Sequence, residues 1–360
     1  IMKNIYKINN YLPNQYDYEK KFNVNHNYLT EQFSDHELIL EKIKKVVLNN
    51  DFTLGKEVDY LEEDFANLIG VKHAIGVGSG TDALFLSLKS IGIKEGDEVI
   101  TTPFTFYATI GAIVTAGAKP VFADICDDYN INASEIEKKI NSKTKAILPV
   151  HWSGKPCDMD AIRDIANKYN LTIVEDACHA ILAKYKNKNA GNLGDIGCFS
   201  FHPLKNLNVW GDGGIITTND PSINHNLRLI RNHGLSGRNT CEIFAYNSRL
   251  DTIQAAILRI KLKDYNKVRH ILLDLSYSGD IFLPINIIEN IWSKTEDKGW
   301  GNGYVDVPSR HPCCNMSPED IKKYGVRNRL PNNVIYKMLE KYYYFEFINK
   351  LKEILNTKRE

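Results

Sequence analysis

The amino-acid sequence predicts an α/β fold built around a mostly parallel β-sheet. Between residues 57 and 263, short runs rich in β-branched and aromatic residues alternate with stretches whose apolar residues recur at helical spacing. This alternation is typical of parallel strands joined by helices. In such a sheet a ligand binds at the carboxyl ends of the strands, so we expect the functional site there.

Seven short segments are expected to form the strands of this sheet. They are residues 73–77, 98–101, 119–125, 146–151, 171–176, 197–201 and 213–218. The expected helices are residues 57–70, 82–91, 107–117, 134–140, 158–169 and 251–263. In the helix at 158–169, Asp158 is a candidate N-cap, and an apolar face runs from Met159 to Tyr169.

The length and charge of the chain limit its organisation and its partners. With 360 residues, we expect an N-terminal segment at 1–50 packing on a large domain at 51–270, followed by an atypical C-terminal region at 271–360. The net charge of +1 argues against binding to nucleic acid or to an anionic membrane. No apolar run is long enough to span a bilayer, and the N-terminus lacks the apolar core of a signal peptide.

Cysteines and histidines give no sign of a disulfide framework or a metal centre. The seven cysteines form no CxxC pair, and the ten histidines form no HxH or HExxH cluster. We therefore expect reduced thiols in a cytoplasmic protein that holds no metal.

One lysine has an unusual context, in the stretch SFHPLKNLNVWGDGG at 200–214. Lys205 lies between a strand-like run and the apolar residues Leu207, Val209 and Trp210, so we expect it to be partly shielded. A shielded lysine amine can serve as a nucleophile. The alternative is a loop lysine that reaches back to water, which is the commoner situation for a lysine.

Two further segments end at the same predicted edge of the sheet. GVGSGTDAL, at 76–84, places small residues between a strand and a helix, which leaves backbone N–H groups for a phosphate. It could equally be an ordinary turn, or a dinucleotide motif that it matches poorly. IVEDACHA, at 173–180, ends a strand on Glu175 and Asp176; a carboxylate there either caps the next segment or holds the ring nitrogen of a cofactor protonated.

An amine that forms a Schiff base, a carboxylate for a pyridine nitrogen and a glycine-rich phosphate cradle are the parts that pyridoxal phosphate requires. TTPFTFYAT, at 101–109, adds Phe104, Phe106 and Tyr107 as flat faces that could stack on a ring, although aromatic residues at such positions are often part of the core.

Seven segments of the chain resemble, in this order, the motifs of one enzyme family. They are GSGTDAL (78–84), TTPFTFYAT (101–109), PVHWSG (149–154), EDACHA (175–180), SFHPLKNLNVWGDGG (200–214), LIRNHG (229–234) and YNSRLDTIQAA (246–256). The family is that of the DegT/DnrJ/EryC1/StrS sugar aminotransferases. The resemblance covers roughly residues 50–270 and implies the aspartate-aminotransferase-like fold (fold type I), a three-layer domain that binds pyridoxal phosphate.

The resemblance also implies roles for individual residues near the cofactor. Lys205 matches the lysine that holds the cofactor covalently, Asp176 matches the partner of the pyridine nitrogen, and Phe106 matches the aromatic residue that stacks on the ring. The residues that match phosphate contacts are Gly80, Thr81 and Ser200.

Two more positions complete the implied site. His179 lies where many family members carry a glutamine near the cofactor hydroxyl, and histidine can donate a hydrogen bond there as well. Asn247 matches an asparagine that reaches the phosphate of the neighbouring subunit, which implies a homodimer with shared active sites.

The resemblance further implies the reaction and its substrates. A related branch that removes a hydroxyl group carries histidine in place of Lys205, so the lysine favours transfer of an amino group from glutamate to a nucleotide-linked keto-sugar. The KNL…GDGG pattern at 205–214 favours a 3-keto over a 4-keto substrate, within amino-sugar and surface-glycan biosynthesis.

Residues 271–360 lack the family pattern, which leaves open a cofactor-binding homologue with a regulatory or structural role. A nicotinamide-dependent α/β enzyme built on GVGSG is a further alternative.

Overall fold

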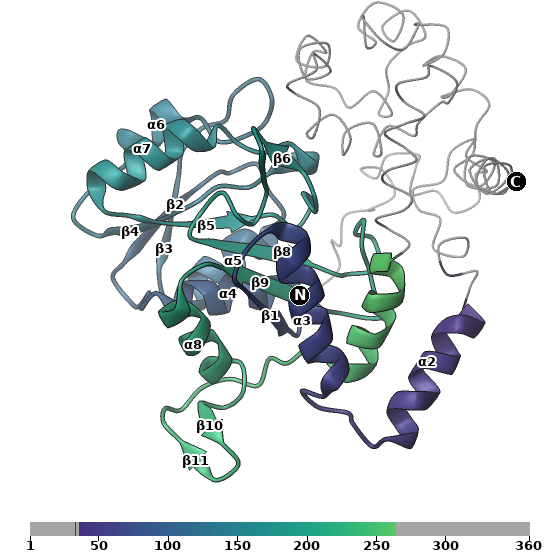
Figure 1. Cartoon of the computed structure of the whole chain (residues 1–360). Coiled ribbons are helices and arrows are strands. Elements are labelled where there is room, and N and C mark those ends of the chain that lie inside the picture. Colours follow the sequence, from purple (N-terminus) through teal and green to yellow (C-terminus); the bar gives the residue numbers. More distant parts are fainter. Residues whose placement is uncertain (1–32, 34–35, 264–360) are drawn as a thin grey trace, which may run out of the picture.

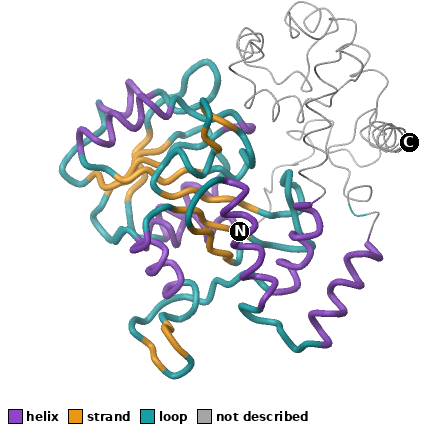
Figure 2. Tube along the Cα trace, in the orientation of Figure 1, coloured by secondary structure: helices purple, strands orange, loops and turns teal. Residues whose placement is uncertain are grey.

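The computed structural model describes residue 33 and residues 36–263, which form a three-layer α/β arrangement around a seven-stranded sheet (Figures 1 and 2). The strand order is β1-β9-β8-β5-β4-β2-β3. The strands are β1 (His73–Val77), β2 (Glu98–Thr101), β3 (Lys119–Phe122), β4 (Thr144–Leu148), β5 (Thr172–Asp176), β8 (Ile196–Ser200) and β9 (Gly214–Thr218). β9 runs antiparallel to both of its neighbours, whereas the other strands of this sheet run parallel to one another.

Helices cover both faces of the sheet. They are α2 (His36–Leu48), α3 (Lys56–Ile69), α4 (Gly80–Ser90), α5 (Tyr107–Thr115), α6 (Ala133–Glu137), α7 (Met159–Tyr169), α8 (Pro221–Ile230) and a helix at 252–263. One face packs against α4, α5 and α8, and the opposite face packs against α3, α6, α7 and the helix at 252–263. α2 lies outside these layers, beside the helix at 252–263 (Figure 1).

The strands are apolar on both sides because both faces are covered. In β9, Ile215 belongs to the core cluster on the α3 face and Ile216 to the cluster on the α4 face. In β1, Ala74 and Ile75 divide in the same way. Near-continuous burial of this kind is typical of sheets sandwiched between helices, and it accounts for the short, uninterrupted apolar runs in the sequence.

Small elements decorate this core. They are the strand pairs β6 (Lys184–Tyr185) with β7 (Lys188–Asn189) and β10 (Leu235–Gly237) with β11 (Thr240–Cys241), and a short 3₁₀ helix, η3 (Trp152–Gly154). The β10–β11 hairpin extends away from the sheet beyond α8 (Figure 1). Within residues 36–263, no helix has the length and apolar character needed to cross a membrane.

The predicted α/β fold with a mostly parallel sheet is confirmed. The strands expected at 73–77 and 98–101 have those bounds, and the other five differ at their ends by one to three residues. Asp158 caps α7 by accepting a hydrogen bond from the Ala161 amide at 3.3 Å. Tyr169 does not complete the buried face of that helix as expected, because it is 39% exposed at the last turn.

Helix α8 was not expected from the sequence, although its start carries clear signals. Asp220 accepts hydrogen bonds from the amides of Ser222 and Ile223, and Pro221 occupies the first turn. The predicted C-terminal region at 271–360 and most of the predicted N-terminal segment at 1–50 lie outside the described residues. The division of the chain into these domains therefore stays a prediction.

Candidate active site

Most of the predicted site residues follow the carboxyl ends of parallel strands. Gly80 and Thr81 begin α4 after β1, and Phe106 precedes α5 after β2. Asp176 is the last residue of β5, and Ser200 is the last residue of β8. Because these strands run in one direction, their ends meet at one edge of the sheet, as the sequence predicts.

The start of α4 forms a cradle suited to an anion. Ser79 caps the helix by accepting a hydrogen bond from the Asp82 amide at 3.0 Å. The amides of Gly80 and Thr81, the first two helical residues, have no intrahelical acceptor, and the helix dipole adds positive potential there. Ser200 lies beside this helix start.

Two glycines allow this close approach. A Cβ added to Gly80 would lie 2.5 Å from the Cβ of Ser200, and a Cβ added to Gly214 would lie 2.3 Å from the carbonyl oxygen of Ser79. Larger residues would therefore push the start of α4 away from β8 and β9. The carboxylate of Asp82 accepts a hydrogen bond from Ser248 Oγ at 2.9 Å, an interaction that fixes the orientation of this negative charge.

Asp176 is a buried carboxylate whose orientation is fixed by two hydrogen bonds. Thr109 Oγ1 donates to Asp176 Oδ2 at 2.8 Å, and the Cys178 amide donates to Oδ1 at 3.3 Å. Thr109 is itself held by Thr105, whose hydroxyl lies 2.7 Å from that of Thr109. With an exposed fraction of only 6%, Asp176 is an oriented negative charge at the edge of the sheet.

Glu175 has a different environment and a structural role. It is completely buried and lies 2.8 Å from His151 Nε2. His151 Nδ1 accepts a hydrogen bond from the Cys157 amide at 3.2 Å, so the ring proton lies on Nε2 and is donated to Glu175. Glu175 also accepts hydrogen bonds from the amides of Gly191, Leu193 and Gly194. Glu175 therefore holds the 191–194 loop against the sheet. Of the two carboxylates, Asp176 remains the candidate for contact with a ligand.

Lys205 lies near both Asp176 and His179. The lysine is half-buried, as expected. Burial and then the positive charge of Lys205 lower the pKa of His179 to about 4, while Asp176 acts in the opposite direction. Burial and then Asp176 raise the pKa of the Cys178 thiol, against the positive charge of Lys205. These mutual influences place the amine, the imidazole and the carboxylate in one electrostatic environment.

The aromatic residues after β2 are exposed at this edge. Phe104, Phe106 and Tyr107 are 37%, 53% and 77% exposed, so the alternative that they belong to the core is wrong. Phe106 adopts an extended conformation just before α5, with its ring centroid 4.0 Å from that of Tyr107.

Sequence reasoning missed an aromatic wall beside His179. The ring of Phe104 stacks on Tyr129 with 4.8 Å between centroids and meets the edge of Trp152 at 4.7 Å. Trp152 in turn contacts His179 with 5.6 Å between ring centroids. Trp152 lies in the PVHWSG segment directly after β4. Its position at the carboxyl end of a predicted strand could have indicated that it belongs to the candidate site.

Asn247 is exposed and lies on the segment that follows the β10–β11 hairpin. Its backbone pairs with Asn232 through an isolated bridge. The next residue, Ser248, accepts a hydrogen bond from the Gly78 amide at 3.1 Å, which ties this segment to the turn before α4. Its exposure leaves the Asn247 side chain accessible to a second subunit.

The residues at this edge fit pyridoxal phosphate. The cradle between Gly80 and Ser200, which a Cβ would fill, suits a phosphate group, and the buried Asp176 suits a protonated ring nitrogen. The half-buried Lys205 offers an amine at the same edge. In the part of the chain that the structure describes, no group of three or more His, Cys, Asp or Glu side chains could hold a metal ion.

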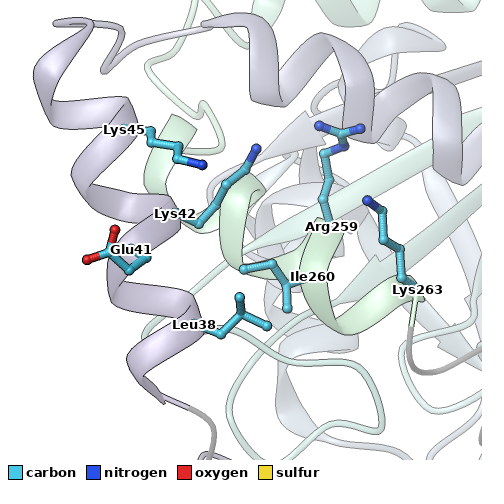
Figure 3. Close-up of a pocket in the computed structure, with 7 residues that line it drawn as sticks. All are labelled: Leu38, Glu41, Lys42, Lys45, Arg259, Ile260 and Lys263. Carbon is cyan, nitrogen blue, oxygen red and sulfur yellow. The ribbon is translucent and has the colours of Figure 1, made fainter.

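A separate hollow of about 160 Å³ lies between α2 and the helix at 252–263 (Figure 3). It is lined by Leu38, Glu41, Lys42, Lys45, Arg259, Ile260 and Lys263. Lys42 and Arg259 both form ion pairs with Glu57, at 2.6 and 2.7 Å. This hollow lies between packed helices, and the candidate active-site residues do not line it.

The fold and this edge are those of an α/β domain whose residues fit pyridoxal phosphate. Residues 34–271 match the model of the DegT/DnrJ/EryC1/StrS aminotransferase family. The chain therefore belongs to this family, as the sequence motifs predict.

Two curated relatives are similar to this chain. The UDP-N-acetyl-3-dehydro-alpha-D-glucosamine 3-aminotransferase of Acidithiobacillus ferrooxidans is 45% identical over 235 residues, which are 64% of this chain and 64% of that protein. A pleiotropic regulatory protein of Geobacillus stearothermophilus is 47% identical over 224 residues, 62% of this chain and 60% of that protein. The chain therefore spans somewhat less than two thirds of the length of these curated relatives.

A solved structure shares the fold. S. venezuelae DesV, solved in complex with a ketimine intermediate, superposes with a TM-score of 0.66 at 39% sequence identity. The match covers 71% of this chain and 71% of that chain.

Proposed function

We propose that this protein is a pyridoxal-phosphate-dependent aminotransferase that moves an amino group from glutamate to a nucleotide-linked keto-sugar. The observation that carries the proposal is the placement of Lys205 and the oriented, buried Asp176 at one sheet edge, beside the cradle at the start of α4. Pyridoxal phosphate, when bound, supplies an electron sink that stabilises negative charge on the substrate carbon next to the transferred nitrogen.

Asp176 would hold the ring nitrogen of the cofactor. A carboxylate that accepts a hydrogen bond from a protonated ring nitrogen forms a charge-assisted pair, and burial strengthens it. The hydrogen bond from Thr109 prevents the Asp176 carboxylate from rotating away from its acceptor position. Asp176 would thus keep the ring in the protonated, electron-withdrawing form.

Lys205 would bind the cofactor and then move a proton. Its amine is a nucleophile that would hold the cofactor covalently by condensing with its aldehyde group, with loss of water. When the amine is not bonded to the cofactor, it would take the proton from the substrate carbon that bears the nitrogen and deliver it to the cofactor carbon bonded to that same nitrogen. The same half-buried side chain would therefore act in both binding and proton transfer.

His179 would lie against the cofactor hydroxyl. With its pKa lowered to about 4 by burial and by Lys205, the ring is neutral at physiological pH and can both donate and accept a hydrogen bond. An amide side chain, which many family members carry at this position, has the same two capacities. Phe106 would stack on the cofactor ring, while Gly80, Thr81 and Ser200 would bind the phosphate.

The substrate proposal is a 3-keto rather than a 4-keto sugar. Its supports are the KNL…GDGG pattern at 205–214 and the name of the A. ferrooxidans relative, which describes a 3-aminotransferase acting on a UDP-linked 3-keto sugar. The product would be an amino-sugar for surface-glycan synthesis in the cytoplasm. The active sites would be shared in a homodimer, in which Asn247 of each subunit would reach the phosphate bound to the neighbouring subunit.

The test is a turnover assay with paired substrates. Purified protein is incubated with pyridoxal phosphate, glutamate and either a 3-keto or a 4-keto UDP-sugar, and 2-oxoglutarate and the amino-sugar are measured. We expect both products with the 3-keto sugar and little with the 4-keto sugar. Faster turnover of the 4-keto sugar would contradict the substrate proposal, and no 2-oxoglutarate from any sugar would contradict the activity.

A second candidate function is a cofactor-binding homologue with a regulatory or structural role. It is favoured by the similarity to the pleiotropic regulatory protein, together with the absence of the family pattern from residues 271–360. Retention of pyridoxal phosphate with no reaction with glutamate or keto-sugars would support this alternative.

A further inference from the structure

The loop that carries Lys205 is closed by one buried side chain, that of Asn208. Asn208 is 2% exposed. Its Nδ2 group donates hydrogen bonds to the carbonyl oxygens of Pro203 at 2.6 Å and of Lys205 itself at 2.9 Å. Both N–H groups of one amide therefore hold the backbone on either side of the reactive lysine.

Asn208 is in turn held by the helix at 252–263. Lys261 Nζ donates a hydrogen bond to Asn208 Oδ1. A cation on the amide oxygen polarises the amide and strengthens the hydrogen bonds that its N–H groups donate. The charge of Lys261 therefore reinforces the two bonds that close the loop.

Further contacts place Lys261 and fasten the end of the same loop. The Lys261 ammonium lies 3.7 Å from the centroid of the Phe33 ring, and Phe33 meets Trp210 edge-on at 6.1 Å. Gln254, on the same helix, donates a hydrogen bond to the carbonyl oxygen of Trp210 at 2.9 Å. The helix at 252–263 thus holds the lysine loop at two points.

We propose that Asn208 and Lys261 form a clamp that positions Lys205 and couples it to the helix at 252–263. The inference rests on the proposed function, because it concerns the amine that would bind the cofactor. Both are positioning residues: Asn208 acts on the backbone of Lys205, and Lys261 acts on Asn208. The amide of Lys205 is already bonded to His202 O at 2.8 Å, so the clamp fixes its carbonyl side.

The first arm of the test needs no cofactor. Amide hydrogen exchange is measured across residues 203–209 in the full chain for Asn208→Ala, for Lys261→Met and for Lys263→Met, an exposed control on the same helix. We expect both clamp variants to exchange at least about tenfold faster than wild type in this loop, since loss of local hydrogen bonds favours local opening. The control should match wild type.

The second arm reads the orientation of the bound cofactor. After addition of pyridoxal phosphate, near-visible circular dichroism is compared with absorbance for each protein. We expect both clamp variants to lose dichroism relative to absorbance and to release the cofactor about tenfold faster, because the lysine is no longer held in one geometry. Thermal unfolding of each variant separates this effect from general destabilisation.

The outcomes distinguish the two proposals. If the clamp variants match Lys263→Met in both arms, the clamp is wrong, whatever the wild-type protein does with the cofactor. If wild type itself forms no near-visible band, the proposed function is overturned, and the exchange arm alone decides whether the clamp holds the loop. If Asn208→Ala does not fold, Lys261→Met decides, because it removes the cation and leaves the amide in place.

Discussion

Glu175 and Asp176 are neighbours in the sequence, but they lie in different environments and have different partners. Successive residues of a strand point to opposite faces, so the two carboxylates cannot share a site. Glu175 meets His151 and a row of backbone amides, whereas Asp176 meets Thr109 and lies within electrostatic reach of Lys205 and His179. The alternation of side chains along a strand predicts that the two residues lie on opposite faces. It does not predict the partners of Glu175, which are distant in sequence.

Replacement of Lys205 should remove activity and spare the fold. Lys205→Ala loses the covalent attachment and the proton-transfer amine, so we expect the transamination rate to fall by roughly 10³-fold or more. Circular dichroism and thermal unfolding should stay close to wild type, because the side chain is only half-buried in a loop. Lys72→Ala, at an exposed position, is the control, and a near-wild-type rate in Lys205→Ala would refute the assignment.

Asp176→Asn should slow catalysis more than it weakens folding. The amide keeps the size of the carboxylate but removes the negative charge that would hold the ring nitrogen protonated. We expect the rate constant for the reaction with glutamate to fall on the order of 10²- to 10³-fold, measured by stopped-flow absorbance. A loss below about tenfold would count against the role of Asp176.

The lowered pKa of His179 makes stability depend on pH in a defined direction. Its pKa is about 4 in the folded protein against 6.5 for an unperturbed histidine, so the unfolded chain binds the proton first as the pH falls. The wild-type protein without cofactor should therefore lose stability relative to His179→Gln between about pH 6.5 and pH 4, by a few kcal/mol at most.

Urea unfolding of both proteins at pH 7 and pH 5 measures this difference. The gap in the free energy of unfolding should move in favour of the glutamine variant at the lower pH. An unchanged gap would mean that His179 is not desolvated in the folded protein.

At the scale of elements, the spacing of apolar residues predicted most strands and helices, because the buried residues of each element recur at a regular spacing. Helix α8 escaped because its sequence, PSINHNLRLI, is largely polar in its first half, with its buried residues concentrated near the end. The capping signals of Asp220 and Pro221 were present, but a cap without a long apolar face predicts a turn as readily as a helix.

Packing between elements also creates a buried ion pair that no local pattern reveals. Arg231, 5% exposed after α8, donates from Nη1 to Glu62 on α3 at 2.5 Å and to the Gly76 carbonyl oxygen on β1 at 2.8 Å. Arg228 also binds Glu62, at 2.9 Å, but is 41% exposed. Arg231 thus connects the end of α8 to α3 and to β1, the strand that precedes the cradle at the start of α4.

Arg231→Met should destabilise the protein much more than Arg228→Met. Removal of Arg231 leaves the buried Glu62 carboxylate with the Gly76 amide and the partly exposed Arg228 as partners, and loss of the buried positive charge should lower the free energy of unfolding by about 3–5 kcal/mol. Loss of the exposed Arg228 should cost about 1 kcal/mol or less. Urea denaturation of the two variants measures both values, and equal losses would show that burial of the pair is not what stabilises it.

At the scale of the whole molecule, the class of sheet was predictable but its strand order was not. The alternation of strands and helices indicates parallel pairing, and it cannot reveal that β9 inserts antiparallel between β1 and β8. That insertion brings Gly214 against Ser79 and so helps to build the anion cradle. The location of the site at the strand ends followed from the fold class, whereas the aromatic wall and the Asn208 clamp depend on tertiary contacts.

Assembly supplies a prediction at this scale. If Asn247 reaches the phosphate of a neighbouring subunit, Asn247→Ala should release pyridoxal phosphate about tenfold faster while remaining dimeric, since one hydrogen bond to a charged group is lost. The loss of cofactor from the loaded protein, followed over time during dialysis, measures the release rate, and sedimentation measures the oligomeric state. A wild-type monomer that retains cofactor would contradict shared sites.

The most direct test of the central claim is the absorbance spectrum of the purified protein with pyridoxal phosphate, recorded before and after excess glutamate. We expect a near-visible band from cofactor bound to Lys205, which disappears when glutamate converts the cofactor to its amine form. A band that forms but does not respond to glutamate would contradict aminotransferase activity and favour a cofactor-binding homologue. Absence of any band would contradict the assignment of Lys205 altogether.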